Sequence, residues 1–244
     1  MSGGRGRGSI AAAGLLAALL AASPSGRADG LWSGTVAVVS DYVFRGVSQT
    51  YESPALQGGV NFQSSSGWFG GAWTSNVDPY PFGIHSLEAD LFAGFAWPLA
   101  ADWSARASYT HYQYLWDRRR RSYAYDELAL TLGYQDRLAL TVSYQPDETR
   151  YSALGLAHNR PAAAYELSGR WPLPHSLALT GGVGYYDLTR LYGVGYWSGS
   201  AGLAYVRGRL EVDLTRFSCD GTVRELFGEA SADGHWVAAV VWRF

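Results

Sequence analysis

The feature that most constrains the fold of this sequence is a series of twelve segments in which apolar and polar residues alternate. A period of two places successive side chains on opposite faces of a strand, so each segment is predicted to be a β-strand. Each is close to the roughly 9–11 residues that a tilted strand needs to cross a bilayer. Their approximate cores are residues 34–44, 55–63, 67–76, 86–96, 103–114, 123–134, 137–146, 161–171, 175–187, 196–206, 209–218 and 235–244.

The connections between these segments alternate between short and long. The short ones are 64–66, 98–101, 135–136, 172–174 and 207–208, and the long ones are 45–54, 77–85, 115–122, 147–160, 189–195 and 219–234. An up-and-down membrane barrel has short periplasmic turns, longer outer loops and an even number of strands. A soluble sandwich has no reason to alternate in this way. The pattern therefore predicts an all-β fold, a single up-and-down antiparallel transmembrane β-barrel of about twelve strands.

The last ten residues show the two faces of such a strand. One face is wholly apolar and consists of Trp236, Ala238, Val240, Trp242 and Phe244. Terminal residues of a soluble domain usually fray, so an aromatic end of this kind is typical of the closing strand of an outer-membrane barrel. We expect the apolar row to face lipid, and Trp242 and Phe244 to act as the signal for the barrel assembly machinery. A terminal strand of a soluble sandwich is the alternative.

Other segments have an apolar row opposite a polar one, and periodicity alone does not say which row faces outward. In segment 86–96, Leu87, Leu91 and Phe95 oppose Glu88 and Asp90. A barrel turns the apolar row to lipid and the polar row to a wet lumen, whereas a sandwich exposes the polar row to water. The composition favours the barrel: 17 Tyr and 10 Trp suit membrane interfaces, and only 16% of residues are charged.

The amino-terminal residues predict export. Arg5 and Arg7 precede an apolar run from Ile10 to Ala22, and small residues follow. This order is typical of a secretory signal peptide, and the run is too short to span a membrane. We expect residues 1–28 to be the signal peptide and residues 29–244 to be the barrel, in the outer membrane of a Gram-negative cell. Cleavage after Ala22 is an alternative.

Part of the sequence matches a known pattern. Residues 40–50 read SDYVFRGVSQT, and PALQGG (54–59), GWFGGAW (67–73), SNVD (75–78) and EADL (88–91) follow. This string, within residues 30–97, resembles the TorF family of exported proteobacterial β-barrel proteins. The resemblance implies an outer-membrane barrel that acts as a porin, without an established substrate or catalytic residue. Its most specific part contains Asp41, Tyr42, Phe44, Arg45 and Gly46.

If the barrel conducts, its selectivity comes from lumen-facing side chains. The candidates are Gln57, Asn61, Glu88, Asp90, Arg106, Thr110, Glu127, Thr131, Glu166, Arg170, Glu211 and Asp213. Glu88 and Asp90 are expected to neighbour Arg106, where the charges either set a transverse field or pair into a plug. Twelve strands give a narrow lumen, which limits passage to small solutes. Acidic candidates outnumber basic ones, which favours cations.

Two further groups of charges have open roles. Asp41 and Arg45 are expected on one strand face, where they form either a structural ion pair or part of a pore mouth. Arg118, Arg119, Arg120 and Arg121 fall in a long outer loop. Guanidinium groups match phosphate geometry, so these arginines either bind lipopolysaccharide phosphates or form a solvated loop.

Catalytic and nucleic-acid functions lack support in the sequence. The five histidines show neither a Gly-x-Ser-x-Gly nor an HExxH context and are too scattered to argue for a metal site. No cofactor is expected. Without residues 1–28 the chain keeps 16 basic and 21 acidic residues, against nucleic-acid binding. Cys219, the only cysteine, cannot form an intramolecular disulfide.

Three hypotheses follow from these observations. The first is a narrow porin that passes small hydrophilic solutes or ions by passive diffusion, without being an enzyme. The second is a non-conducting structural or binding barrel, its lumen blocked by charge pairs and its loops in contact with lipopolysaccharide or a partner. The third, least supported by the sequence, is a lipid-modifying barrel enzyme.

Overall fold

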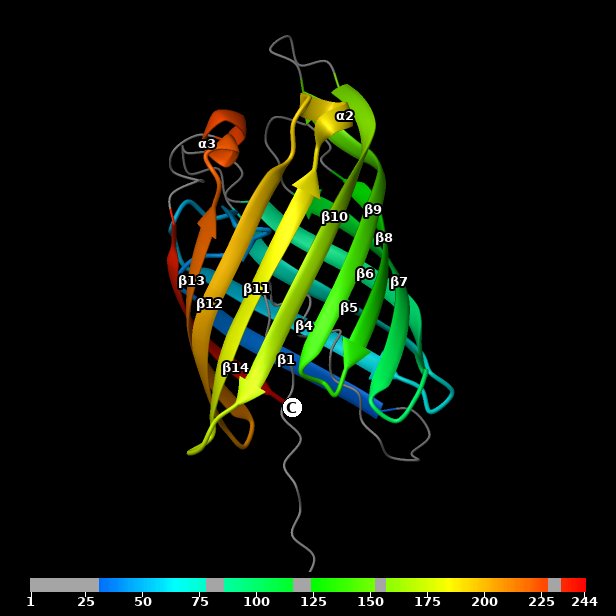
Figure 1. Ribbon diagram of the computed structural model, residues 1–244, viewed down its shortest axis with the longest axis vertical. Coiled ribbons are helices and arrows are strands. Elements are labelled where there is room, and N and C mark those ends of the chain that lie inside the picture. Colours follow the sequence, from blue (N-terminus) through cyan, green and yellow to red (C-terminus); the bar gives the residue numbers. More distant parts are fainter. Residues whose placement is uncertain (1–30, 78–85, 116–123, 152–156, 228–233) are drawn as a thin grey trace, which may run out of the picture.

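The computed structural model describes residues 31–77, 86–115, 124–151, 157–227 and 234–244, and in this part of the chain twelve strands form a closed antiparallel barrel (Figure 1). This confirms the predicted fold. The barrel strands are β1 (Leu31–Val39), β4 (Ala55–Gln63), β5 (Trp68–Val77), β6 (Ser86–Pro98), β7 (Trp103–Leu115), β8 (Tyr125–Tyr134), β9 (Leu138–Tyr151), β10 (Ala157–Pro172), β11 (Leu177–Asp187), β12 (Tyr196–Arg207), β13 (Leu210–Cys219) and β14 (Trp236–Arg243).

The barrel closes where β1 pairs with both β4 and β14. Val38 of β1 lies opposite Val240 of β14, and the seam ends with two backbone hydrogen bonds between Gly34 and Phe244, of 2.8 and 3.0 Å. The Phe244 ring packs over Gly34, where a Cβ atom would lie 2.6 Å from the ring. Closure removes the free sheet edges that would otherwise leave backbone groups unpaired.

The outer surface of the barrel is apolar, as the alternation predicts. In β14 the exposed side chains are those of Trp236, Ala238, Val240 and Trp242, with Phe244 next to the strand, while Val237, Ala239 and Val241 are buried. The segment 86–96 behaves in the same way, with Leu91 exposed and Glu88 and Asp90 buried. Both rows therefore face as the barrel hypothesis requires, with the polar residues inside.

Aromatic side chains gather at the two ends of this apolar band. At the end with the short turns, called the turn end below, the rings of Trp32 and Phe62 lie 5.1 Å apart, and those of Trp103 and Tyr134 lie 4.8 Å apart. The opposite end carries the long connections and is called the loop end; there Trp197 is exposed and contacts Tyr185.

Short and long connections alternate as predicted, with two differences in detail. β9 and β10 extend well into the expected loop 147–160, with a register shift between Arg160 and Ala162. The sequence hid this because Pro146 and Pro161 interrupt the alternation there. Two short helices, α2 (Thr189–Tyr192) and α3 (Thr222–Phe227), lie in long connections where no helix was expected.

No helix in the described ranges is long and apolar enough to cross a membrane.

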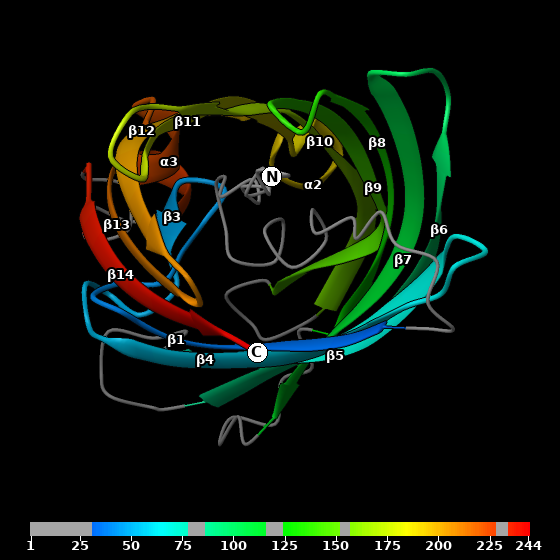
Figure 2. The same ribbon diagram turned by 90° about the horizontal axis from the view of Figure 1, so that it is seen from below.

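The connection between β1 and β4 folds into the barrel. It contains the small hairpin of β2 (Val43–Phe44) and β3 (Val47–Ser48), and β3 is visible within the ring of strands when the barrel is seen along its axis (Figure 2). We call residues 40–54 the inserted loop. Its side chains Tyr42, Val43 and Val47 are buried.

Candidate functional site

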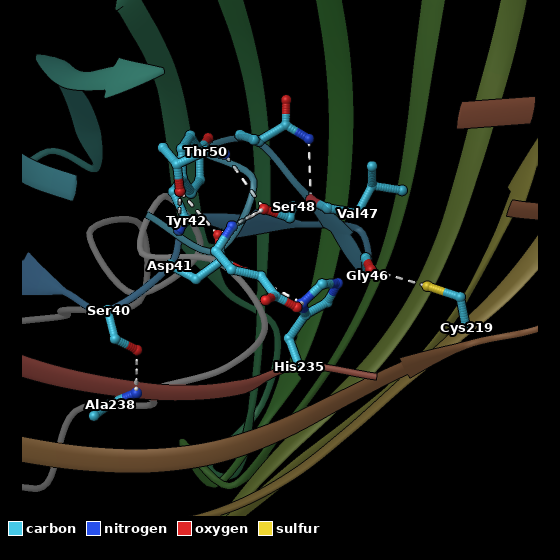
Figure 3. Close-up of polar contacts among 12 residues, drawn as sticks. Ser40, Asp41, Tyr42, Gly46, Val47, Ser48, Thr50, Cys219, His235 and Ala238 are labelled. Atoms are coloured by element: carbon cyan, nitrogen blue, oxygen red, sulfur yellow. Dashed lines mark hydrogen bonds and ion pairs between the residues drawn. The ribbon is translucent and has the colours of Figure 1, made fainter. Parts of the chain in front are cut away.

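The inserted loop is held by its own hydrogen bonds around Asp41. The Asp41 carboxylate accepts hydrogen bonds from the hydroxyls of Ser48, at 2.6 Å, and Thr50, at 2.8 Å (Figure 3). The Thr50 hydroxyl also accepts a hydrogen bond from the backbone N–H of Tyr42, at 3.0 Å. Asp41, Ser48 and Thr50 are all buried. Buried polar groups need such partners, so this network fixes one conformation of the loop.

Four further contacts attach the loop to β13, to β14 and to His235, the residue before β14. Nδ1 of His235 lies 3.5 Å from the Asp41 carboxylate and 3.2 Å from that of Glu52. The Ser40 hydroxyl accepts a hydrogen bond from the backbone N–H of Ala238, and the Cys219 thiol donates to the carbonyl of Gly46 (Figure 3). The loop is therefore tied to the wall at its base and at its tip.

The tip of the hairpin is a two-residue turn formed by Arg45 and Gly46. Both have positive φ angles, 49° and 82°, as a tight turn between antiparallel strands requires. Gly46 also packs so closely against Cys219 and Ser198 that a Cβ atom there would overlap them. The Arg–Gly pair of the SDYVFRG string is thus explained by the turn and by its contact with β13.

Arg45 carries a positive charge into the barrel and is paired with the wall. Its Nη2 atom donates a 2.7 Å hydrogen bond to Glu127 of β8, and its Nε atom lies 3.7 Å from Glu166 of β10. The guanidinium group also lies over the rings of Phe44 and Tyr186, at 4.7 and 4.9 Å. Burial alone would lower the pKa of Arg45, but Glu127 and Glu166 raise it well above its usual value.

Apolar contacts fill the space on both sides of the hairpin. On one side the Tyr42 ring packs against Trp73, and Phe44 packs against Tyr112, which stacks on Tyr125 with centroids 4.4 Å apart. On the other side, Val47 belongs to a second buried cluster with residues of α2 and α3 and the strands beside them, namely Ala162, Leu188, Leu191, Tyr196 and Val223. The inserted loop thus packs like a core, which narrows the lumen at this level.

The structure places the pore-lining candidates in the inward rows of their strands. Gln57, Asn61, Glu88, Asp90, Thr110, Glu127, Arg170 and Glu211 are buried, and Arg106, Thr131, Glu166 and Asp213 are partly buried. Most belong to one of two charged groups. The loop-end cluster consists of Arg45, Glu88, Asp90, Glu127 and Glu166, and the turn-end cluster of Arg170, Glu211, Asp213 and Arg243.

The turn-end cluster is built from strand residues alone. Glu211 of β13 accepts a 2.8 Å hydrogen bond from Arg170 of β10 and a 2.6 Å hydrogen bond from Arg243 of β14. Asp213 lies two residues further along the same inward row of β13. Arg106, near the turn end of β7, lies over the ring of Phe69 at 4.3 Å.

Two expected pairings are wrong. Asp41 and Arg45 do not share a strand face, because β1 ends at Val39 and both residues lie in the inserted loop with different partners. Glu88 and Asp90 do not neighbour Arg106: the register pairs Asp90 with Tyr112, which is about 20 Å from Arg106 along β7 at about 3.3 Å per residue. Two residues on neighbouring strands can therefore lie at very different levels along the barrel axis.

Some predicted residues lie outside the described part of the structure, and some residues of the site were not predicted from the sequence. Arg118, Arg119, Arg120 and Arg121 lie outside the described residues, as do residues 1–28. Sequence reasoning missed His235 and Cys219 as anchors of the loop, since no local pattern links them to residues almost 200 positions earlier. Within the described residues, no group of three or more His, Cys, Asp or Glu is arranged to hold a metal ion.

A closed antiparallel barrel with an apolar outer band and a polar inner face has the architecture that defines the class of transmembrane β-barrels. The chain belongs to a bacterial family described as "Bacterial protein of unknown function (Gcw_chp)", whose model matches residues 22–224.

Solved porin structures share this fold. The KdgM porin is 7% identical, with a TM-score of 0.54 over 87% of this chain and 98% of that chain. The NanC porin is 8% identical, with a TM-score of 0.53 over 86% of this chain and 98% of that chain. At such low identity the likeness shows the shared fold alone. Among curated protein sequences, none matches this chain.

Proposed function

We propose that the protein is an outer-membrane porin that passes small hydrophilic solutes or ions through a lumen narrowed by the inserted loop. The observation that carries this proposal is the position of Arg45, which reaches from the β2–β3 turn to Glu127 and Glu166 on the opposite part of the wall. A charged residue held across a lumen by a folded-in loop is a means of setting the size and charge of what passes.

The outer surface supports the membrane location. Leu, Val and Trp side chains are exposed on the outward rows, including Leu56, Leu91, Leu130 and Val240, each at least 50% exposed. Such a surface is unfavourable in water and suits the hydrocarbon core. The aromatic pairs at both ends fit the interfacial girdles of membrane barrels. The proposed place is the Gram-negative outer membrane, reached through cleavage of the signal peptide predicted in residues 1–28.

The likeness to porins fits this proposal, as does the resemblance to the TorF family, which would make the present protein a member of a porin family. One of the similar structures is a KdgM porin in complex with disordered oligogalacturonate. The four acidic side chains and one arginine of the loop-end cluster argue against a polyanion as the solute here. Contact of Arg118–Arg121 with lipopolysaccharide and recognition of Trp242 and Phe244 by the assembly machinery are parts of the same proposal.

A second function is favoured by one observation, the burial of the β2–β3 hairpin within the inserted loop. Tyr42, Val43, Arg45 and Val47 are each less than 9% exposed, as in a protein core. A loop packed in this way would make a non-conducting barrel with a structural or binding role. The two proposals differ in whether the lumen conducts past the loop or is blocked by it.

Conductance separates these functions. Protein refolded into detergent should first show heat-dependent migration on a denaturing gel, the sign of a folded membrane barrel. In planar bilayers we expect small, discrete conductance steps in KCl. Bilayers that stay closed at all voltages would reject the porin and leave the non-conducting barrel, and a protein that is soluble without detergent would reject both.

A further inference from the structure

The loop-end cluster contains more negative than positive charge. It contains four inward-facing carboxylates, those of Glu88 and Asp90 on β6, Glu127 on β8 and Glu166 on β10, and one arginine, Arg45. That arginine is already in contact with Glu127 and lies beside Glu166. Glu88 and Asp90 therefore have no arginine of their own among the described residues.

Asp90 combines deep burial with a lack of hydrogen-bond partners in the described part of the chain. Its side chain is 1% exposed, and within the described residues neither carboxylate oxygen has a hydrogen-bond partner. It also interacts electrostatically with Glu88 and Glu127, which repel it. Buried carboxylates are normally paired or bound to a cation, because burial of an isolated charge is costly.

Further oxygen atoms are found on the neighbouring strands. The register aligns Gln57 of β4, Ser75 of β5 and Glu88 of β6. The amide oxygen of Gln57 is buried and without a hydrogen-bond partner in the described part of the chain, although its NH₂ group donates to Ser75 at 3.3 Å. Carboxylate, amide and hydroxyl oxygens are the ligands that hard cations prefer.

The turn-end cluster shows how this barrel neutralises a carboxylate when no ligand is involved. Glu211 is also 1% exposed, yet both of its oxygens accept hydrogen bonds from arginine, one from Arg170 and one from Arg243. A carboxylate at the same burial is thus fully paired at one end of the lumen. Among the described turn-end carboxylates one oxygen, Oδ1 of Asp213, is buried without a hydrogen-bond partner, whereas both oxygens of Asp90 are.

We propose that Asp90, with Glu88 and the amide oxygen of Gln57, binds small monovalent cations such as K⁺ at the loop end and makes the lumen cation-selective. A monovalent ion fits better than a chelated divalent metal, because no group of three or more metal-binding side chains occurs among the described residues. The role in selectivity rests on the proposed porin function; the binding of the cation does not.

The first test measures selectivity. Reversal potentials in a KCl gradient should show a preference for K⁺ over Cl⁻ in the wild-type protein. The double variant Asp90→Asn/Glu88→Gln keeps the shapes of the side chains and should lower the K⁺/Cl⁻ permeability ratio by about tenfold, as two nearby charges would. Glu211→Gln is the matched control and should change the ratio much less, because its charge is shared by two arginines. A channel with an unchanged ratio in the double variant would overturn the proposal.

The second test does not need conductance. We expect the thermal unfolding midpoint of the refolded protein in detergent to be higher in KCl than in N-methylglucamine chloride at equal ionic strength, since the large organic cation does not fit among these side chains. Asp90→Asn should abolish the difference, and Glu211→Gln should keep it. Equal midpoints for the wild-type protein in both salts would contradict cation binding. If bilayers show no conductance but the unfolding midpoint depends on K⁺, the porin function is rejected and the cation site is retained.

Discussion

The two charged clusters of the lumen use the same residue types but differ in where the arginine comes from. At the turn end, Arg170 and Arg243 are wall residues and hold Glu211 from two sides. At the loop end, Arg45 comes from the inserted loop and is the one arginine of its cluster, where it contacts the wall residues Glu127 and Glu166. The turn-end cluster is therefore a permanent part of the sheet, whereas the loop-end cluster exists only while the loop stays inside. At the loop end, the charge of the lumen therefore depends on a segment that is not part of the sheet.

Removal of the hairpin should have the largest effect. Replacing residues 42–49 with a short Gly-Ser linker takes away Tyr42, Val43, Arg45 and Val47, which fill the lumen at this level. We expect a severalfold rise of single-channel conductance in planar bilayers, because the twelve-stranded wall remains. Far-ultraviolet circular dichroism and heat-dependent migration on a gel serve as controls for an intact barrel. An unchanged conductance would mean that the hairpin does not limit passage.

The next largest effect is expected from loss of the loop arginine. Arg45→Ala leaves the buried Glu127 without its cation, which should cost about 3–5 kcal/mol of stability. Arg243→Ala is the matched change at the turn end and should cost only about 1 kcal/mol, because Glu211 keeps Arg170 and Arg243 is partly exposed. Urea unfolding in detergent, followed by tryptophan fluorescence, measures both. Equal losses for the two variants would erase the distinction between the clusters.

A smaller effect is expected at the turn of the hairpin. Gly46→Ala forces a Cβ atom into a left-handed conformation and against Cys219, so it should cost more than the roughly 1–2 kcal/mol of the conformation alone. Gly208→Ala, in the short turn between β12 and β13, meets nothing within 4 Å and should show only the conformational cost. The double variant Gly46→Ala/Cys219→Ala should recover part of the loss. If Gly46→Ala matches Gly208→Ala, the hairpin does not pack against β13.

The smallest effect on the lumen is expected from a change at the barrel seam. Phe244 closes the seam through backbone hydrogen bonds with Gly34 and lies on the outer face. Deletion of Phe244 should lower the amount of protein assembled into outer membranes, measured by immunoblotting of membrane fractions. Channels that do assemble should keep the wild-type conductance. A conductance change without a loss of assembled protein would contradict this division between seam and lumen.

The strands and their faces could be predicted from the sequence because each depends on local alternation and on the sharp contrast between lipid and lumen. The outward row of β14 is an example. The inserted loop could not, because residues 40–44 continue the alternation of β1 and resemble the end of a strand. The break follows from the hydrogen bonds of Asp41 with Ser48 and Thr50, seven and nine residues later, and from His235 near the other end of the chain.

The charged site was predicted in its members but not in its arrangement. The pore-lining candidates lie on the inner face, because successive side chains of a strand point to opposite faces. Which of these side chains contact one another depends on the stagger of the strands and on the position of the inserted loop. Neither can be predicted from local alternation. Arg45 therefore paired with Glu127 instead of Asp41, and Arg106 lay far from Asp90.

The central claim, that the loop sits inside the lumen and limits it, is tested most directly by a covalent tether. The Cys219 thiol donates a hydrogen bond to the carbonyl of Gly46, the residue before Val47, and packs against the buried cluster that contains Val47, so Val47→Cys should form a disulfide with Cys219 on mild oxidation. We predict a linked peptide pair in the mass spectrum after proteolysis, and a low conductance that is the same before and after reduction of the disulfide. If residue 47 and Cys219 remain free thiols in the folded protein under the same oxidation, the loop does not occupy the lumen and the account is wrong.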